Sequence, residues 1–137
     1  MKFDTIIKHL EFELSNQSQI MFAYIYGSAL SSDKPRDIDI AVYLFPKDFE
    51  KLSRDGEVSF SFAIPLEMDL EKQLKRKIDV QVLNRAPLSF RYRVISDGRL
   101  IVDRDSNARC DFEYLSRVEY YDFSPRRKEY LQEVMAW

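Results

Sequence analysis

The first apolar patterns of the chain predict a helix followed by a buried strand. Between positions 3 and 15, apolar residues recur at helical spacing, which predicts an amphipathic helix. Residues 20–26 are almost continuously apolar and aromatic, as expected for a central strand that is buried on both faces. Gly27 and Ser28 follow directly and predict a turn at the end of this strand.

Alternation with a period of two predicts two further strands. In residues 37–44, one face is aliphatic and the other is not; the aliphatic face is Ile38, Ile40, Val42 and Leu44, and the other is Asp37, Asp39, Ala41 and Tyr43. In residues 77–82, the same alternation sets Ile78, Val80 and Val82 against Asp79 and Gln81.

Helical patterns separate these strands. Pro46 opens a polar segment with a short helix, and residues 58–65 show no clear pattern. Leucines at positions 66, 70 and 74 then mark the inner face of a helix. The charged residues of this segment are expected largely on the outside: Glu67, Glu71, Lys72, Lys75 and Lys77.

The last part of the chain predicts a helix over residues 88–97, a short edge strand over 100–102 and helices from about residue 106. Gly98 is a typical residue just beyond a helix end. Ser124 and Pro125 predict the start of a final helix, with a capping serine and a proline at the first position. The order of elements predicts an α/β (α+β) fold, a mixed β-sheet flanked by helices with one end free for a site. We expect one domain over residues 1–137, of which 106–137 form a C-terminal helical tail.

Composition limits the classes of partner. A length of 137 residues suits a single domain, and a net charge of −2 gives no chain-wide basic field, so direct nucleic-acid binding is not expected. A single cysteine excludes an internal disulfide and suits the reducing cytoplasm. The N-terminus lacks a secretory pattern, and no apolar run approaches the roughly 20 residues of a membrane span. We therefore expect a cytoplasmic protein that does not bind membranes.

A small-residue turn and an acid pair stand close together in the sequence. Gly27-Ser28 supplies backbone N–H groups and a hydroxyl that can bind phosphates. Asp37 and Asp39 occupy alternate strand positions, so their side chains share a face, with Cα atoms about 6–7 Å apart. Hard carboxylate oxygens at this spacing suit Mg²⁺, which binds through one or two carboxylates and substrate phosphates. The alternative is a polar loop with solvated aspartates, but aspartate is depleted in strands, and such local exceptions are typical of functional sites.

Asp79 is a candidate third carboxylate. It lies on the polar side of the strand predicted over residues 77–82. If this strand lies beside the strand of Asp37 and Asp39, three carboxylates form one cluster whose mutual repulsion calls for bound cations. The alternative is a lone, solvated strand aspartate.

These motifs extend over nearly the whole chain: Gly27-Ser28, Arg36-Asp37-Ile38-Asp39, Lys77-Ile78-Asp79-Val80, and the segments 86–88, 98–101 and 119–125. Together they resemble the nucleotidyltransferase superfamily with the DNA polymerase β-like catalytic fold. More closely, they resemble the minimal nucleotidyltransferases, the MNT antitoxins that are paired with HEPN toxins in bacteria and archaea.

The resemblance implies an Mg²⁺-dependent transfer of AMP from ATP to a tyrosine of a cognate HEPN toxin, a helical ribonuclease, which is thereby silenced. It implies that Asp37 and Asp39 bridge two Mg²⁺ ions and that Asp79 completes the second metal site and can act as general base. Gly27 and Ser28 would hold the β- and γ-phosphates. Arg36 can touch a phosphate, although strand alternation turns its side chain away from the acid pair.

Two other functions stay open at this point. The chain can be a non-catalytic antitoxin that acts by binding alone, although the intact acid triad counts against this. It can also be a small-molecule nucleotidyltransferase, for example one that modifies an antibiotic, but so short a chain has little room for an acceptor domain. A homo- or hetero-oligomer is compatible with each of these functions.

Overall fold

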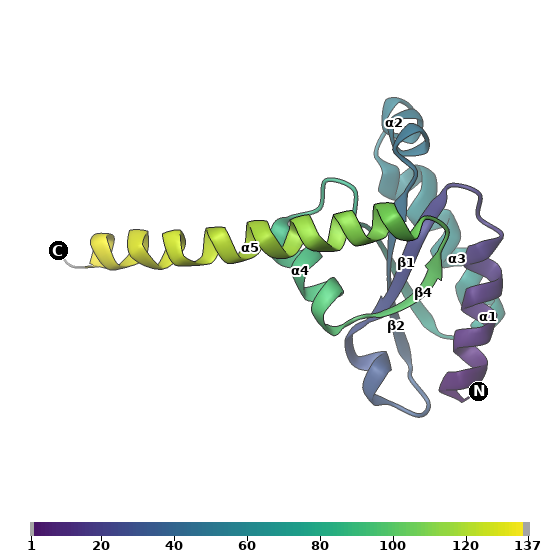
Figure 1. The fold of residues 1–137 in the computed structure, drawn as a ribbon. Helices are drawn as coiled ribbons and strands as arrows, with labels where there is room; N and C mark the ends of the chain where they lie inside the picture. The colour runs from purple at the N-terminus through teal and green to yellow at the C-terminus, as the bar shows by residue number, and fades with distance from the viewer. Residues whose placement is uncertain (1, 136–137) are drawn as a thin grey trace.

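A mixed β-sheet forms the centre of the molecule (Figure 1). We describe it from a computed structural model that covers residues 2–135 and the side chains of all of these except 123–131 and 133–135. The strands are β1 (Ile20–Tyr26), β2 (Asp37–Leu44), β3 (Lys77–Val82) and β4 (Arg99–Asp103), in the order β3-β2-β1-β4. β1 pairs antiparallel with β2 and with β4, whereas β2 pairs parallel with β3. The predicted α/β class with a mixed sheet flanked by helices is confirmed.

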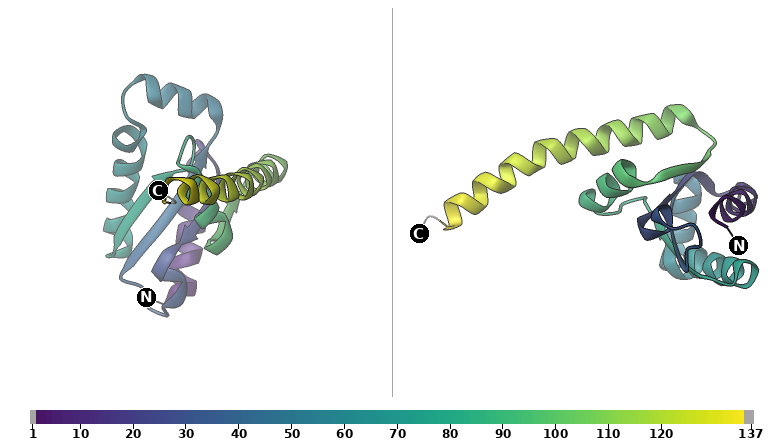
Figure 2. Two further views of the ribbon diagram at one scale, coloured as in Figure 1. Left: turned by 90° about the vertical axis from the view of Figure 1, so that its left-hand side faces the viewer. Right: turned by 90° about the horizontal axis from the view of Figure 1, so that it is seen from below.

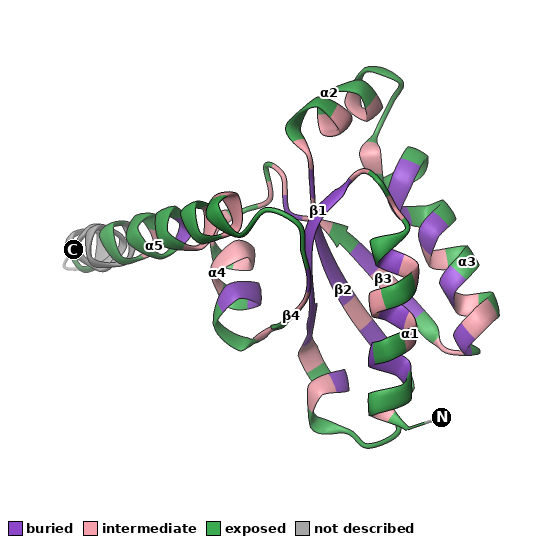
Figure 3. Cartoon of the chain, turned by 45° about the vertical axis from the view of Figure 1, so that its right-hand side comes forward, coloured by how far each residue is buried: buried purple, intermediate pink, exposed green. Residues whose placement is uncertain are grey.

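Helices cover both faces of this sheet, as the two turned views in Figure 2 show. The helices α1 (Phe3–Ser15) and α3 (Ile64–Leu74) pack on one face, and α4 (Leu88–Asp97) and the first turns of α5 (Ser106–Met135) pack on the other. A short helix, α2 (Pro46–Arg54), lies at one end of the sheet. The buried residues of α1 and α3 lie on the sides of these helices that face the strands (Figure 3). Two apolar layers therefore enclose the sheet.

The burial of the strands follows their sequence patterns. All residues of β1 are buried, because this strand is central and covered on both faces. The aliphatic face of β2 joins the core beneath α1 and α3, whereas Ala41 and Tyr43 pack on the opposite side beneath α4 and α5. The polar positions Asp37 and Asp39 are less buried than their aliphatic neighbours. They lie at the start of the strand.

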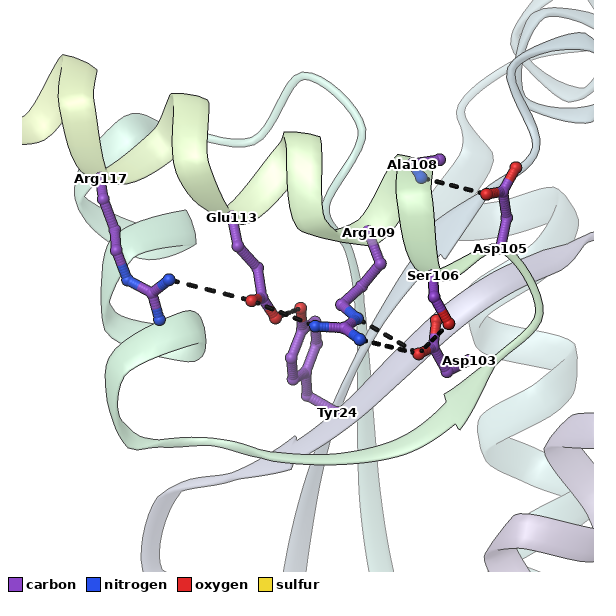
Figure 4. A network of polar contacts seen from close by, with 8 residues as sticks. All are labelled: Tyr24, Asp103, Asp105, Ser106, Ala108, Arg109, Glu113 and Arg117. Atoms are coloured by element: carbon purple, nitrogen blue, oxygen red, sulfur yellow. Dashed lines mark hydrogen bonds and ion pairs between the residues drawn. The ribbon is translucent and has the colours of Figure 1, made fainter.

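A polar network fastens the start of α5 to the sheet (Figure 4). The hydroxyl of Tyr24 on β1 donates a 2.7 Å hydrogen bond to Glu113. Glu113 also accepts from Arg109 at 3.4 Å, and Arg109 pairs with Asp103 on β4 at 2.9 Å. Beyond this network, α5 runs away from the sheet.

The structure differs from the sequence prediction at two helix boundaries. Residues 59–63, which lacked a clear pattern, form a π-helical turn that continues directly into α3. The predicted restart at Ser124 and Pro125 is wrong, since α5 is one helix from Ser106 to Met135. Pro125 removes one backbone hydrogen bond from a helix interior but does not end the helix. A serine–proline pair therefore marked a position inside a helix and not its first turn.

Gly98 follows α4 as predicted, but for a different reason. Its φ of −82° is open to any residue, so no left-handed helix end requires glycine here. A Cβ atom at this position would lie 2.4 Å from the carbonyl oxygen of Val94 and 3.2 Å from that of Ile25. Glycine is needed because the chain passes so close to α4 and β1.

Among residues 2–135, no helix combines the length and the apolar character needed to cross a membrane.

Candidate active site

The parallel pairing of β2 and β3 brings the predicted carboxylates together. Asp39 on β2 is the Cα partner of Asp79 on β3, and Asp37 is the partner of Lys77. Neighbouring strands lie about 4.8 Å apart, and partners in register point to the same face. The expectation that the strand of Asp79 lies beside that of Asp37 and Asp39 is therefore confirmed.

These side chains border a cavity of about 490 Å³ at the start of the two strands. Its wall is strongly acidic: the lining residues are Ser28, Asp37, Ile38, Asp39, Glu67, Glu71, Lys77, Ile78 and Asp79. Lys77 is the one basic residue among them. Such a wall attracts cations and repels an anionic substrate unless cations are bound.

Burial and neighbouring charges act together on Asp39. Burial raises the pKa of this carboxyl, and the charges of Asp79 and Asp37 raise it further, while Arg93 and Lys77 oppose the rise. Tyr26, the strand partner of Asp39 on β1, responds to the same field. Burial together with Asp39 and Asp79 raises the pKa of its hydroxyl to about 12. The site thus carries an excess of negative charge that its own cations do not neutralise.

The donor chemistry of this cluster fits Mg²⁺, which prefers carboxylate oxygens. In the part of the chain that the structure describes, however, no three acidic, histidine or cysteine side chains already converge as a complete ligand set. Asp79 accepts hydrogen bonds of 3.2 and 3.3 Å from the amide of Gln81 on its own strand. Each carboxylate oxygen has two lone pairs, so Asp79 can accept these bonds and still bind a cation.

The Gly27-Ser28 turn closes one side of the cavity. Gly27 opens a short 3-10 helix, Gly27–Ser31, with a φ of +81° that side chains other than hydrogen resist. A Cβ atom there would lie 2.7 Å from Oδ2 of Asp39. Ser28 is exposed and lines the cavity. The structure thus places the predicted turn directly against the predicted acid pair, and glycine is what allows the close approach.

Arg36 lies apart from the acidic cavity. Its side chain is exposed and lines a neighbouring, basic cavity with Lys34, Pro35, Asp37, Lys75, Arg76 and Lys77. This agrees with the strand alternation, which turns Arg36 away from Asp39. Contact between Arg36 and a phosphate stays a prediction.

The expectation that Glu67 and Glu71 lie on the outside of their helix is wrong. Both are partly buried, line the acidic cavity and accept hydrogen bonds from the backbone of β3. Their charge alone predicts an exposed position, like that of the lysines at positions 72, 75 and 77. Their spacing of four residues, in a helix joined to β3 by only two residues, is the signal that could have revealed them.

Tyr26 and Arg93 are two further neighbours of the acid cluster that the sequence did not single out. Tyr26 was assigned to the buried strand, and its ring packs edge-on against Phe90 of α4, with centroids 5.5 Å apart. Arg93 follows Phe90 by three residues, so both lie toward one side of α4. It is the cation with the largest opposing effect on the pKa of Asp39. No periodicity in the sequence marks either residue as part of a site.

Comparisons with known proteins agree with this arrangement. Residues 8–107 match the family model described as polymerase beta, nucleotidyltransferase. A search of curated proteins finds no significant match.

Several solved structures share the fold along almost the full chain. One is described as a tri-AMPylated Shewanella oneidensis HEPN toxin in complex with MNT antitoxin; the match has a TM-score of 0.69 and 19% identity and covers 97% of this chain and 98% of the other. A toxin–antitoxin structure with AMP-PNP matches with a TM-score of 0.67 and 20% identity over 98% and 99% of the two chains. A structure of the toxin–antitoxin MntA-HepT matches with a TM-score of 0.64 and 20% identity over 97% and 96%. At these identities the likeness is one of fold.

Proposed function

The chain belongs to the polymerase β nucleotidyltransferase family, and we propose that it is an antitoxin that transfers AMP from ATP to a tyrosine hydroxyl of a HEPN toxin. The observation that carries this proposal is the register of Asp39 beside Asp79, with Gly27 packed against Asp39. A carboxylate cluster next to a glycine turn combines the two requirements of nucleotidyl transfer, a cation site and space for phosphates.

Asp37, Asp39 and Asp79 are the residues that would hold Mg²⁺. When bound, two such ions would neutralise the triphosphate and favour the attacking hydroxyl in its ionised form. The raised pKa of Asp39 supports this role, because a carboxylate held in repulsion gains most from a cation.

The chain's own groups then have distinct tasks. The Ser28 hydroxyl and the backbone N–H groups after Gly27 would bind the β- and γ-phosphates. The tyrosine oxygen attacks the α-phosphorus of ATP, a new O–P bond forms, and the bond to pyrophosphate breaks. Asp79 would accept the proton of the tyrosine hydroxyl. Catalysis of this kind depends mainly on positioning and charge.

The proposed acceptor rests on the structural neighbours. One neighbour is described as a complex with a tri-AMPylated HEPN toxin, and another contains AMP-PNP. A hetero-oligomer with such a toxin follows from this proposal.

Labelled ATP provides the direct test. The purified chain, mixed with a HEPN toxin and Mg²⁺, should transfer label from α-labelled ATP to the toxin, and a chelator should abolish the transfer. Asp39→Asn should reduce the rate at least 100-fold, whereas Asp69→Asn, on the exposed side of α3, should leave it unchanged. Transfer by Asp39→Asn at the wild-type rate would refute the assignment of the site.

A further inference from the structure

We infer that Glu67 and Glu71 are positioning residues that hold β3, and with it Asp79, in place beside Asp39; the importance of Asp79 in this statement rests on the proposed function. Both glutamates belong to α3 and not to the strands that carry the aspartates. They act on the backbone of β3 and reach Asp79 only through it.

The hydrogen bonds of β3 support this role. β3 is at the edge of the sheet, so one side of its backbone pairs with β2 and the other side has no strand partner among residues 2–135. On the open side, the N–H of Ile78 donates to Oε1 of Glu71 at 3.1 Å, and the N–H of Val80 donates to Oε1 of Glu67 at 2.8 Å. The two residues that flank Asp79 are therefore both bonded to α3.

The spacing of the two glutamates matches the spacing of the two N–H groups. Positions four apart on a helix are separated by about 6 Å along its axis. Alternate residues of a strand are separated by about 6.6 Å. Glu71 bonds to the nearer residue and Glu67 to the farther one, so α3 runs antiparallel beside β3. The pair of carboxylates thus replaces the missing neighbouring strand.

Arg76 fixes the link between α3 and β3. Its Nε donates to the carbonyl of Pro35 at 2.7 Å, and its Nη1 donates to the carbonyl of Leu74 at 2.8 Å. The link is thereby tied to the segment that leads into β2. With the start of β3 held in this way, the two glutamates determine how closely the rest of the strand follows β2.

Glutamate adds negative charge to the cavity, whereas an uncharged hydrogen-bond acceptor at the edge of β3 would not. Both side chains line a cavity that already contains three aspartates. Added negative charge there raises repulsion. A charged acceptor, however, forms the stronger hydrogen bond to a backbone N–H. We therefore expect the bond itself to be the function of these side chains, and a neutral acceptor of the same shape should preserve most of it.

Amide hydrogen exchange tests the positioning without reference to activity. Glu67→Ala should speed exchange of the Val80 amide at least tenfold, and Glu71→Ala should do the same for Ile78. The amide of Ala23, in the centre of β1, should stay within twofold and so report unchanged global stability. Glu67→Gln should keep the Val80 amide within threefold of the wild type, because the amide oxygen still accepts. Asp69→Ala, on the exposed side of α3, is the matched control.

The rate of AMP transfer tests the consequence for Asp79. Glu67→Ala should lower kcat at least tenfold and change the KM for ATP less than threefold, and Glu67→Gln should restore kcat to within threefold. If Glu67→Ala changes neither exchange nor kcat, or if Glu67→Gln is as impaired as Glu67→Ala, the inference is wrong. It is equally wrong if Val80 exchanges faster while kcat stays at the wild-type value.

The proposed function can fail separately. If the wild type transfers no AMP to any HEPN toxin, the proposed function is refuted. Selective exchange at Ile78 and Val80 would then still support the positioning of β3 by the two glutamates, and unchanged exchange would refute that as well.

Discussion

Asp39 and Asp79 lie side by side as partners in the parallel ladder of β2 and β3, and burial and the neighbouring charge raise the pKa of Asp39. A raised pKa means that the folded chain holds this proton to a higher pH than the unfolded chain does. The free energy of unfolding therefore falls as the pH rises from the ordinary aspartate pKa of about 3.9 through the raised value. The full destabilising effect is present once the pH lies above the raised value.

Asp39→Asn should consequently stabilise the metal-free protein. We expect the free energy of unfolding at pH 7 to rise by about 1 kcal/mol, the order of repulsion between neighbouring, partly solvated charges. The gain should shrink as the pH falls through the raised pKa toward the ordinary aspartate value of about 3.9, because protonation removes the charge of the wild-type carboxyl. Denaturant unfolding in the presence of a chelator measures both effects, with Asp69→Asn as the control.

Mg²⁺ should stabilise the wild type more than it stabilises Asp39→Asn. A cation that binds the folded wild type stabilises it by mass action, whereas Asp39→Asn has lost one of the carboxylates that would hold the cation. The wild type should therefore gain more stability from millimolar Mg²⁺ than Asp39→Asn does. Equal gains for the two proteins would contradict a cation site at Asp39.

Gly27, directly after β1, and Gly56, shortly after α2, allow a matched pair of glycine substitutions. Gly27 and Gly56 both have positive φ angles, of +81° and +136°, but a Cβ at Gly56 would meet nothing within 4 Å. Each alanine variant should cost about 1 kcal/mol or more of stability from backbone strain. Only Gly27→Ala should also displace Asp39, whose Oδ2 would lie 2.7 Å from the new Cβ.

Activity should separate the two variants. Gly27→Ala should weaken ATP binding and abolish AMP transfer, while Gly56→Ala should bind and transfer like the wild type. Calorimetric titration with ATP and Mg²⁺ measures the first effect. Wild-type ATP affinity in Gly27→Ala would rule out the phosphate-binding role of this turn.

The sequence was sufficient for the elements whose patterns are local. The bounds predicted for α1, β1 and β2 are those observed, because α1 and β2 have a clean apolar period and β1 is a continuous apolar run that ends at a glycine. Alternation also fixes which face of its own strand each of Asp39 and Asp79 occupies. That the two residues lie side by side depends in addition on the pairing of β2 with β3, which the sequence leaves as a condition. The parallel direction of β3 was not predicted, because it depends on how the chain crosses over between strands.

The misassigned residues show where local patterns fail. A glutamate on a helix gives the same sequence pattern whether it faces water or the edge of a strand. The pattern therefore predicts Glu67 and Glu71 on the outer, solvent-exposed face of α3. Ser124 and Pro125 favour a helix start, yet the backbone of α5 continues through them. The role of Gly98 also depends on tertiary contacts, since Ile25 on β1 is one of the two residues that crowd it. For the glutamates and for Gly98, the contact that determines the role of the residue is made with a strand and cannot be read from the helix pattern alone.

The network that anchors α5 gives a stability prediction away from the cavity. Burial raises the pKa of Tyr24, and its hydrogen bond to Glu113 raises it further. Tyr24→Phe removes the bond and leaves Glu113 with its arginine partners, so it should cost about 1–2 kcal/mol. Tyr92→Phe is the control, because the Tyr92 hydroxyl contacts that of Tyr121 at 3.2 Å in an exposed position. Tyr92→Phe should lower the free energy of unfolding by less than about 0.5 kcal/mol. Similar losses in thermal or denaturant unfolding would show that the network does not anchor α5.

The last prediction separates catalysis from neutralisation by binding alone. When the wild-type chain is co-expressed with a HEPN toxin, the toxin should become heavier by about 329 Da for each AMP added to a hydroxyl. Growth should be rescued by the wild type and not by Asp37→Asn/Asp39→Asn, because the double variant keeps the fold but lacks the carboxylates that would hold Mg²⁺. Asp69→Asn should rescue like the wild type. Rescue by the double variant with unmodified toxin would mean that binding alone neutralises the toxin. That result would refute the catalytic proposal but support the HEPN toxin as the partner. If the wild type neither modifies nor binds the toxin, both the catalytic proposal and the toxin partner are refuted. A nucleotidyltransferase that acts on a small molecule would then explain the acid cluster better.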